Sequence, residues 1–167
     1  MTDRSAALIK TLIFTLLVPG TVTVYVPYRL LDRVPRPASW VALAAGLCLS
    51  VPGLGVYLRC AWEFVKDGRG TPAPIDAPKK LVVSGLNRFV RNPMYVGVAS
   101  MVLGESIMFG SRVLLIYAAG LAVMFNLFVM FYEEPTLRKK FGANYDEYCR
   151  RVPRWIPRLR IGVGRVG

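Results

Sequence analysis

Histidine is absent from the 167 residues of this chain, and only ten residues are acidic. Without histidine there can be no Ser-His-Asp or Cys-His nucleophile, and no zinc site that depends on imidazole. The cysteines Cys48, Cys60 and Cys149 form no CxxC pair, so we expect free thiols rather than disulfides or a metal site. Any catalysis must therefore depend on Glu, Asp, Arg, Tyr, Asn or backbone groups.

Apolar residues make up 54% of the sequence, with a mean hydropathy of +0.41, and they gather in long uncharged blocks. A soluble core would alternate apolar and polar residues, so these blocks predict an integral membrane protein. The net charge of +12 raises nucleic acid as a partner. The basic residues flank apolar blocks, however, and we expect them to contact anionic lipid headgroups and no nucleic acid.

Four segments are long enough to cross a bilayer, and they predict an all-α bundle of about four transmembrane helices. These are residues 11–28, 37–58, 92–111 and 113–132. The first segment follows the basic residues Arg4 and Lys10, and this pattern is also compatible with a signal peptide. No small-x-small cleavage site follows it and Pro19-Gly20 interrupts it, so we favour a retained, kinked span.

The positive charges predict the orientation of these spans. If both termini are cytoplasmic, the inner segments hold 18 of the 22 Lys and Arg residues, and the outer loops hold only Arg29, Arg33, Arg36 and Arg112. The inner loop from Glu63 to Arg91 is rich in Gly and Pro, which predicts irregular structure in its first half. Residues 133–167 are expected to be cytosolic and to form an amphipathic surface helix, with Leu137, Phe141, Tyr145 and Tyr148 on one face. The whole chain, 1–167, is then a single membrane domain.

The last two spans must form a tight antiparallel hairpin, because only Gly110, Ser111 and Arg112 connect them. Counting about 20 residues in each direction from this turn brings two polar groups to the same depth. We therefore expect the first group to face the second: Arg91, Asn92 and Tyr95, opposite Glu133 and Glu134. Two adjacent acids need a cationic partner or a functional reason. Either Arg91 neutralises one acid and anchors the hairpin, or a polar pocket opens inward for a cofactor.

These residues resemble a known family. Two stretches, Gly85-Leu86-Asn87-Arg88-Phe89-Val90-Arg91-Asn92-Pro93-Met94-Tyr95-Val96-Gly97 and Tyr132-Glu133-Glu134-Pro135-Thr136-Leu137, are similar to the isoprenylcysteine carboxyl methyltransferase family, which is related to the phospholipid N-methyltransferases. Phe141-Gly142, Tyr145, Tyr148 and Val152-Pro153-Arg154 continue the similarity. The resemblance implies an integral membrane enzyme that takes a methyl group from S-adenosylmethionine on the cytosolic side. With the small size, it also implies a bacterial inner membrane.

The resemblance also implies site residues. Arg91 and Glu134 are the expected catalytic residues, and the expected cofactor-binding set is Arg88, Asn92, Pro93, Tyr95, Gly97, Glu133 and Glu134. In this hypothesis Arg88 or Arg91 faces the cofactor carboxylate, and the two acids accept hydrogen bonds from ribose hydroxyls or the ammonium group. Gly97 either permits close approach to the cofactor or packs two helices together.

One residue departs from the family pattern, because many members carry histidine at the position of Asn92. Asparagine still forms hydrogen bonds but cannot act as a general base. The methyl acceptor is expected to be a membrane lipid or lipophilic small molecule with a carboxylate or an amine. The alternatives are a small four-span transporter subunit, in which the intramembrane acid Glu105 couples a cation, or a noncatalytic membrane scaffold.

Overall fold

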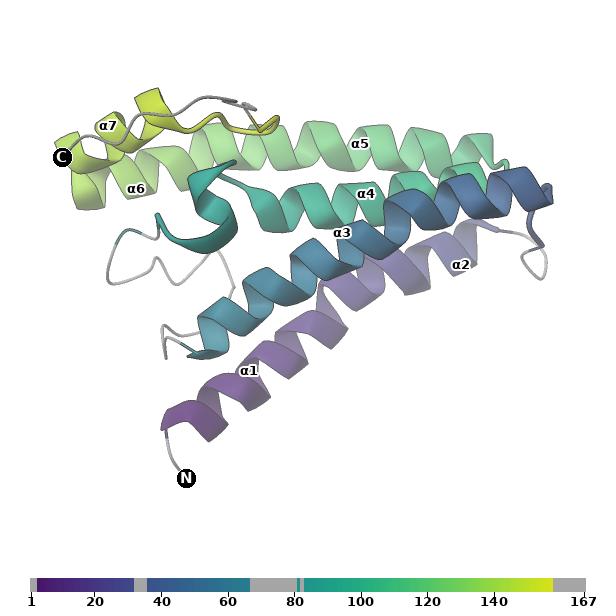
Figure 1. Ribbon diagram of the computed structural model, residues 1–167, viewed down its shortest axis with the longest axis horizontal. Coiled ribbons are helices and arrows are strands. Elements are labelled where there is room, and N and C mark those ends of the chain that lie inside the picture. The colour runs from purple at the N-terminus through teal and green to yellow at the C-terminus, as the bar shows by residue number, and fades with distance from the viewer. Residues whose placement is uncertain (1–2, 32–35, 67–80, 82, 158–167) are drawn as a thin grey trace, which may run out of the picture.

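The computed structural model describes residues 3–31, 36–66, 81 and 83–157, and all regular structure in these ranges is helical, as the sequence predicts (Figure 1). The elements are α1 (Asp3–Leu17), a π-helical turn (Thr21–Tyr25), α2 (Val26–Leu30), α3 (Trp40–Lys66), a 3₁₀ turn (Gly85–Arg88), α4 (Pro93–Met108), α5 (Arg112–Phe128), a second π-helical turn (Val129–Glu133), α6 (Glu134–Phe141) and α7 (Ala143–Arg151). Most of the inner loop predicted to be irregular, residues 67–80, lies outside the described residues.

Three helical segments are long and apolar enough to cross a membrane: Thr11–Leu30, Trp40–Glu63 and Arg112–Phe141. The segment predicted to be the third of four spans, 92–111, forms the shorter helix α4 of 16 residues. Its length is reduced because Pro93 occupies the first turn, where proline is tolerated, and Phe109 and Gly110 already belong to the following turn. The chain is thus an integral membrane protein, and its described residues include three full-length candidate spans and one shorter apolar helix.

The α4–α5 hairpin closes through a glycine in the left-handed region. Gly110 has φ +58°, and the amides of Phe109 and Ser111 donate to the carbonyls of Glu105 and Ser106. The Ser111 hydroxyl then accepts a hydrogen bond from Leu114 N and caps α5. The antiparallel hairpin expected from the short connection is confirmed. We call the opposite end of the bundle, which holds Pro93 and Glu133, the inner end.

Helices α3 and α4 pack together through glycines. A Cβ atom at Gly97 would lie 2.7 Å from the carbonyl oxygen of Gly53, and Gly104 is similarly close to the Gly46 backbone. The Ser50 hydroxyl donates to the carbonyl of Met101 across this contact, at 3.2 Å. Small residues let the two backbones approach each other, which is the common way for helices to associate in a bilayer.

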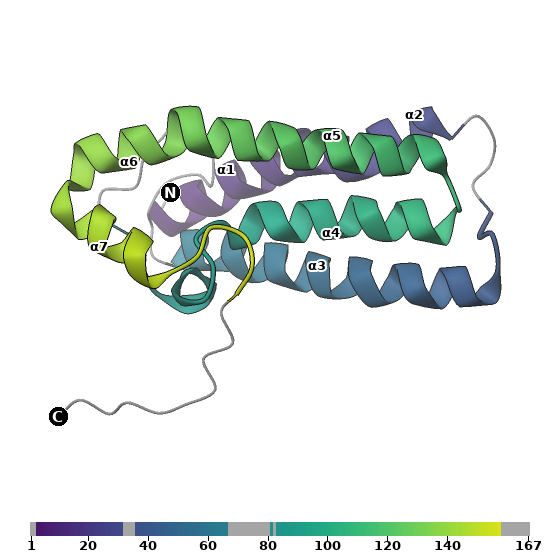
Figure 2. The same ribbon diagram turned by 90° about the horizontal axis from the view of Figure 1, so that it is seen from above.

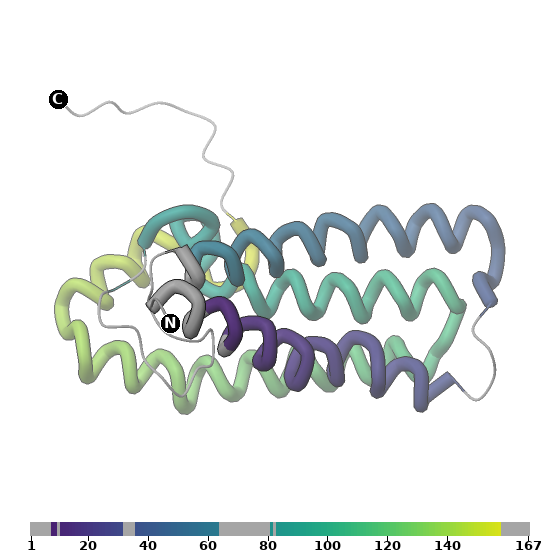
Figure 3. The backbone as a smooth tube through the Cα atoms, turned by 90° about the horizontal axis from the view of Figure 1, so that it is seen from below, coloured from purple at the N-terminus to yellow at the C-terminus, as the bar shows by residue number. Residues whose placement is uncertain are grey.

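The first span and the C-terminal segment lie on opposite faces of the α4–α5 pair. Figure 1 shows α1 below the hairpin and α7 above it, and α1 crosses in front of α4 and α5 when seen from below in Figure 3. Thr15 and Tyr57 join α1 to α3 through a hydrogen bond of 2.7 Å. The interruption expected at Pro19-Gly20 is followed by the π-helical turn, after which α2 continues the span.

The segment after the last predicted span differs from the single surface helix that we expected. Helix α5 continues through the second π-helical turn into α6, so the helical rod extends to Phe141. Gly142, with φ +54° and ψ −131°, then ends α6, and α7 folds back along the bundle (Figure 2). A long side chain cannot easily adopt this backbone conformation, so the glycine divides the segment into two helices.

Candidate functional site

The two acids at the inner end of α5 lie in and directly after the second π-helical turn. Consecutive residues of a helix point about 100° apart, and a π-helical turn further changes the direction of the residues that follow it. Glu133 therefore faces α4, where it accepts a hydrogen bond of 3.1 Å from the Tyr95 hydroxyl. Glu134 faces the C-terminal segment and is 7% exposed. The expected meeting of these two helix ends is confirmed.

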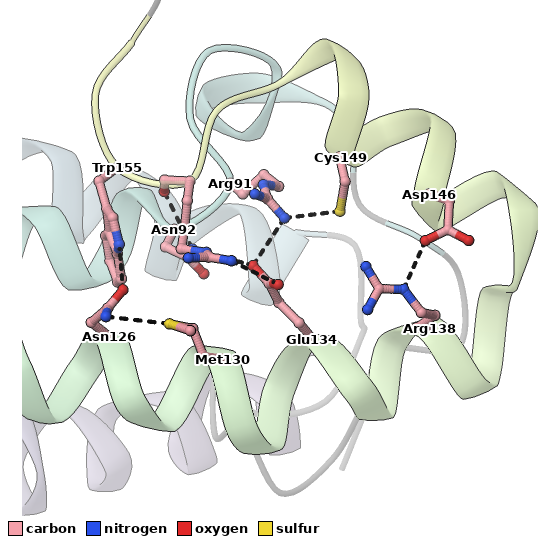
Figure 4. A network of polar contacts seen from close by, with 10 residues as sticks. Arg91, Asn92, Asn126, Met130, Glu134, Arg138, Asp146, Cys149 and Trp155 are labelled. Atoms are coloured by element: carbon pink, nitrogen blue, oxygen red, sulfur yellow. Dashed lines mark hydrogen bonds and ion pairs between the residues drawn. The ribbon is translucent and has the colours of Figure 1, made fainter.

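Glu134 is held by two arginines (Figure 4). Its Oε1 accepts hydrogen bonds from Arg91 Nη1 at 2.9 Å and from Arg154 Nε at 2.7 Å, and its Oε2 accepts from Arg154 Nη2 at 3.0 Å. The bidentate bond from Arg154 has the geometry that makes guanidinium–carboxylate pairs strong. The same hydrogen bonds raise the pKa of Arg154 above its ordinary value. Because two cations share one carboxylate, this group of three carries a net positive charge.

The segment Val152–Pro157, which we call the C-terminal strap, lies across the start of α4. Arg91 N donates to the Pro153 carbonyl at 2.9 Å, and Asn92 Nδ2 donates to the Arg154 carbonyl at 3.3 Å. The amide of the buried Asn92 thus fastens the strap by its backbone, a bond that asparagine makes without changing charge.

Helix α7 supports the strap from its N-terminal side. The Tyr148 hydroxyl donates to the Asn87 carbonyl in the 3₁₀ turn at 2.7 Å. Burial raises the pKa of Tyr148, so this donor stays protonated at neutral pH. Cys149, one turn from the strap, places its Sγ 2.8 Å from Arg91 Nη1. All three cysteines are free thiols, as the sequence predicts.

An aromatic group adjoins the acids. Tyr95 packs against Phe125 with ring centroids 4.9 Å apart, and the Trp155 ring meets Tyr95 edge-on at 6.5 Å. The Trp155 indole N–H donates to Asn126 Oδ1 at 3.0 Å. Aromatic faces beside a carboxylate favour a ligand with positive charge, such as an ammonium or sulfonium group.

The structure brings together five of the predicted site residues at the inner end: Arg91, Asn92, Tyr95, Glu133 and Glu134. Pro93 starts α4 between them and is buried. Arg88 lies outside this group, exposed, with its guanidinium 5.9 Å from the Phe89 ring centroid. Gly97 lies in the contact with α3, next to Gly53, so its surroundings correspond to helix packing and not to cofactor approach. Glu105 is in the outer half of α4, and its Oε2 is buried without a hydrogen-bond partner among the described residues.

Sequence reasoning missed four contributors: Asn126, Cys149, Arg154 and Trp155. Arg154 and Trp155 follow Pro153 in a stretch without helical periodicity, so no spacing argument places them opposite a helix end. Two signals pointed to Arg154: the Val152-Pro153-Arg154 stretch that continues the family similarity, and the acid pair, since a single Arg91 leaves one of two adjacent acids without a cation.

One donor in the group has no acceptor in the part of the chain that the structure describes. Arg91 Nε is buried and has no hydrogen-bond partner among the described residues. A buried guanidinium N–H without a partner is costly, and an acceptor of negative charge satisfies it. With the net positive charge around Glu134, this donor fits a ligand carboxylate, while Glu133 fits a hydroxyl or ammonium donor.

Comparison with known proteins places the chain in a family. The family model described as phospholipid methyltransferase matches residues 41–144. Protein-S-isoprenylcysteine O-methyltransferase of Schizosaccharomyces pombe is 31% identical over 109 residues, which cover 62% of this chain and 45% of that protein. Protein-S-isoprenylcysteine O-methyltransferase B of Arabidopsis thaliana is 33% identical over 78 residues, covering 47% and 40%.

The chain is also similar to a protein that is named for a different activity. Delta(14)-sterol reductase LBR of Gallus gallus is 29% identical over 133 residues, which cover 71% of this chain and 20% of the reductase. The chain thus spans less than half the length of each of these relatives. No solved structure matches. Because the family model covers more than half of the sequence, this chain belongs to the phospholipid methyltransferase family, with isoprenylcysteine O-methyltransferases among its relatives.

Proposed function

We propose that this protein transfers a methyl group from S-adenosylmethionine to a membrane-embedded or amphiphilic acceptor. The observation that carries the proposal is the buried Arg91 Nε, which has no partner among the described residues and lies in a network that joins the start of α4 to the end of the α5 rod. Family membership supplies the reaction class. Arg91, Glu133 and Glu134 fall within the matched residues 41–144, whereas Cys149 and Arg154 lie beyond them.

Each group of the network has a role in the proposal. S-Adenosylmethionine, when bound, supplies a methyl group on a sulfonium that an acceptor displaces in line. Arg91 binds the donor carboxylate through Nε, and Glu134 fixes the position of Arg91. Glu133 accepts hydrogen bonds from donor hydroxyl or ammonium groups, and the aromatic ring of Tyr95 lies beside positive charge. Asn92 and Pro93 hold the start of α4 in place.

The acceptor carries a carboxylate or an amine in this proposal, and the protein sits in a bacterial inner membrane with both termini cytoplasmic. Exposed basic residues near the network, such as Lys139 and Arg150, then contact anionic lipid headgroups.

Donor binding is tested by titrating S-adenosylmethionine into protein purified in lipid nanodiscs. Loss of one charge-assisted hydrogen bond of about 1.5–3 kcal/mol predicts binding at least roughly tenfold weaker for Arg91→Ala. The exposed Arg88→Ala is the matched control, and equal losses for the two variants would contradict the role of Arg91.

The labelled product of the reaction shows whether the acceptor group is a carboxylate or an amine. Nanodisc protein is incubated with methyl-labelled donor and a membrane lipid extract, and the labelled lipid is treated with mild alkali. Alkali hydrolyses a methyl ester to a carboxylate and volatile labelled methanol, whereas an N-methyl group stays on the amine and the label remains non-volatile. No binding and no transfer in any lipid would favour the noncatalytic scaffold or the transporter over the enzyme.

A further inference from the structure

The strap carries one aromatic side chain that no step of the proposed reaction uses. Trp155 reaches from the strap to the α4–α5 pair, where it contacts Tyr95 of α4. Its indole N–H donates to Asn126 of α5 (Figure 4). Its ring therefore spans the two helices of the hairpin on the face opposite to α1. It is half-buried, with one part against the helices and one part exposed.

The anchor of Trp155 lies deeper in the bundle than the ionic network. Asn126 precedes Glu134 by eight residues, which corresponds to about 12 Å along the helix. Leu127 at the end of α5 and Met130 in the second π-helical turn are exposed apolar residues at this level, and lipid is the surrounding that suits them. An indole at this level has an apolar ring for hydrocarbon and one N–H that needs a polar partner, which Asn126 supplies.

Strong bonds fix the strap in this position. The preceding residue, Arg154, is tied by its side chain to Glu134 and by its carbonyl to Asn92. The following residue, Ile156, is 80% exposed. The strap thus alternates an ionic anchor, an aromatic ring over the helices and an apolar residue in the surroundings. This order suits a segment that lies at the boundary between the site and the lipid.

We propose that Trp155 forms the bilayer-side wall of the transfer site, and that it determines how a lipid-borne acceptor reaches the Tyr95–Glu133 pair. The inference rests on the proposed function because it assumes that a methyl acceptor enters the site. The position of Trp155 against the α4–α5 pair does not depend on that function. An apolar acceptor chain approaches along α5 and meets the indole first. Replacing the indole with a small side chain opens a direct path from lipid to Tyr95.

Quenching by brominated phospholipid tests the wall without any donor or acceptor. The chain has three tryptophans, so Trp40→Phe with Trp62→Phe leaves Trp155 as the single fluorophore. In bilayers of phosphatidylcholine brominated at acyl carbons six and seven, we expect strong quenching of Trp155. Fluorescence that is insensitive to the brominated lipid would show that the ring does not contact the acyl chains and would overturn the proposal.

A second fluorophore tests whether the ring screens the site. In the same background, Tyr95→Trp serves as the reporter and is combined with either Trp155→Phe or Trp155→Ala. The phenyl ring retains most of the aromatic area, so we expect about twofold stronger quenching of the reporter with Trp155→Ala than with Trp155→Phe. Equal quenching in the two would overturn the proposal. Thermal unfolding of both proteins confirms that each is folded.

A methyl-transfer assay is the last test of the wall formed by Trp155. Trp155→Ala in the otherwise natural chain is expected to change the ratio of labelled lipid to labelled water-soluble product. An unchanged ratio counts against the wall. If the natural protein transfers no methyl group, the proposed function is contradicted instead. The two quenching experiments then still determine where Trp155 lies.

Discussion

Glu133 and Glu134 are adjacent in sequence but have different partners, and this difference separates binding from stability. Glu134 is buried between two guanidinium groups, whereas Glu133 accepts one hydrogen bond from Tyr95. Glu134→Gln leaves Arg91 and Arg154 without their carboxylate, and we expect it to lower the free energy of unfolding by about 3 kcal/mol.

Glu133→Gln is the matched variant, because the amide oxygen of glutamine still accepts from the Tyr95 hydroxyl. We expect the free energy of unfolding to change by no more than about 0.5 kcal/mol, while donor binding is weakened. Thermal unfolding in detergent and donor titration measure the two effects. If both variants unfold alike, the assignment of Glu134 as the structural acid is wrong.

A second prediction at the scale of single residues concerns the replacement of Arg154. Arg154→Met removes a bidentate bond to a buried acid but leaves Arg91 in place, so we expect a loss of about 2 kcal/mol and release of the strap. Arg151→Met is the control, since Arg151 is exposed and its ion pair among the described residues is with Glu147 on the surface of α7. Limited proteolysis with chymotrypsin, which cleaves after aromatic residues such as Trp155 and therefore at sites present in both variants, reports release of the strap; equal cleavage of the two variants would contradict its anchoring by Arg154.

The sequence predicts part of this site because its geometry follows from counting. A three-residue turn and a fixed rise per residue are enough to bring Arg91 and Tyr95 to the acids. Which acid takes which partner depends on the π-helical turn, and no residue type in Val129–Glu133 marks such a turn. Arg154 joins through an irregular segment, where position depends on tertiary contacts and not on periodicity.

At the scale of elements, the same limit applies to the corner at Gly142. The periodic apolar residues Leu137, Phe141 and Tyr145 predict one helix, and the glycine among them is compatible with a helix at modest cost. The structure instead uses this glycine at φ +54°, and Tyr145 is buried on the far side of the corner. Periodicity predicted the existence of helix here but not the break.

Two alanine substitutions isolate the backbone at this corner. A Cβ atom at Gly142 or at Gly120 would have no neighbour within 4 Å among the described residues, so neither substitution creates a clash there. Only Gly142 has a positive φ, and we expect Gly142→Ala to cost about 1–3 kcal/mol of unfolding free energy. Gly120→Ala, inside α5, is expected to be neutral or slightly stabilising. Equal unfolding midpoints for the two variants would show that α6 and α7 need no special corner.

At the scale of the whole molecule, the charge distribution predicts which end of the bundle faces the cytoplasm. In a protein with its three cysteines replaced by alanine, Arg112→Cys reports the α4–α5 turn and Arg150→Cys reports α7; both positions are exposed. An impermeant maleimide added to intact cells with a permeabilised outer membrane is expected to label Arg112→Cys, and Arg150→Cys only after disruption of the inner membrane. Labelling of both from the same side would mean that the helices between them do not separate the two compartments.

The brevity of α4 has a consequence for where the chemistry happens. Sixteen residues span about 24 Å, roughly 6 Å less than the hydrocarbon layer that the longer neighbouring helices cross. With the Gly110 turn at the outer surface, as the charge distribution predicts, the start of α4 lies within the hydrocarbon layer, and the adjoining leaflet thins to meet it. In the proposed reaction, a lipid-borne acceptor then reaches the inner end of α4 from this thinned leaflet without leaving the membrane.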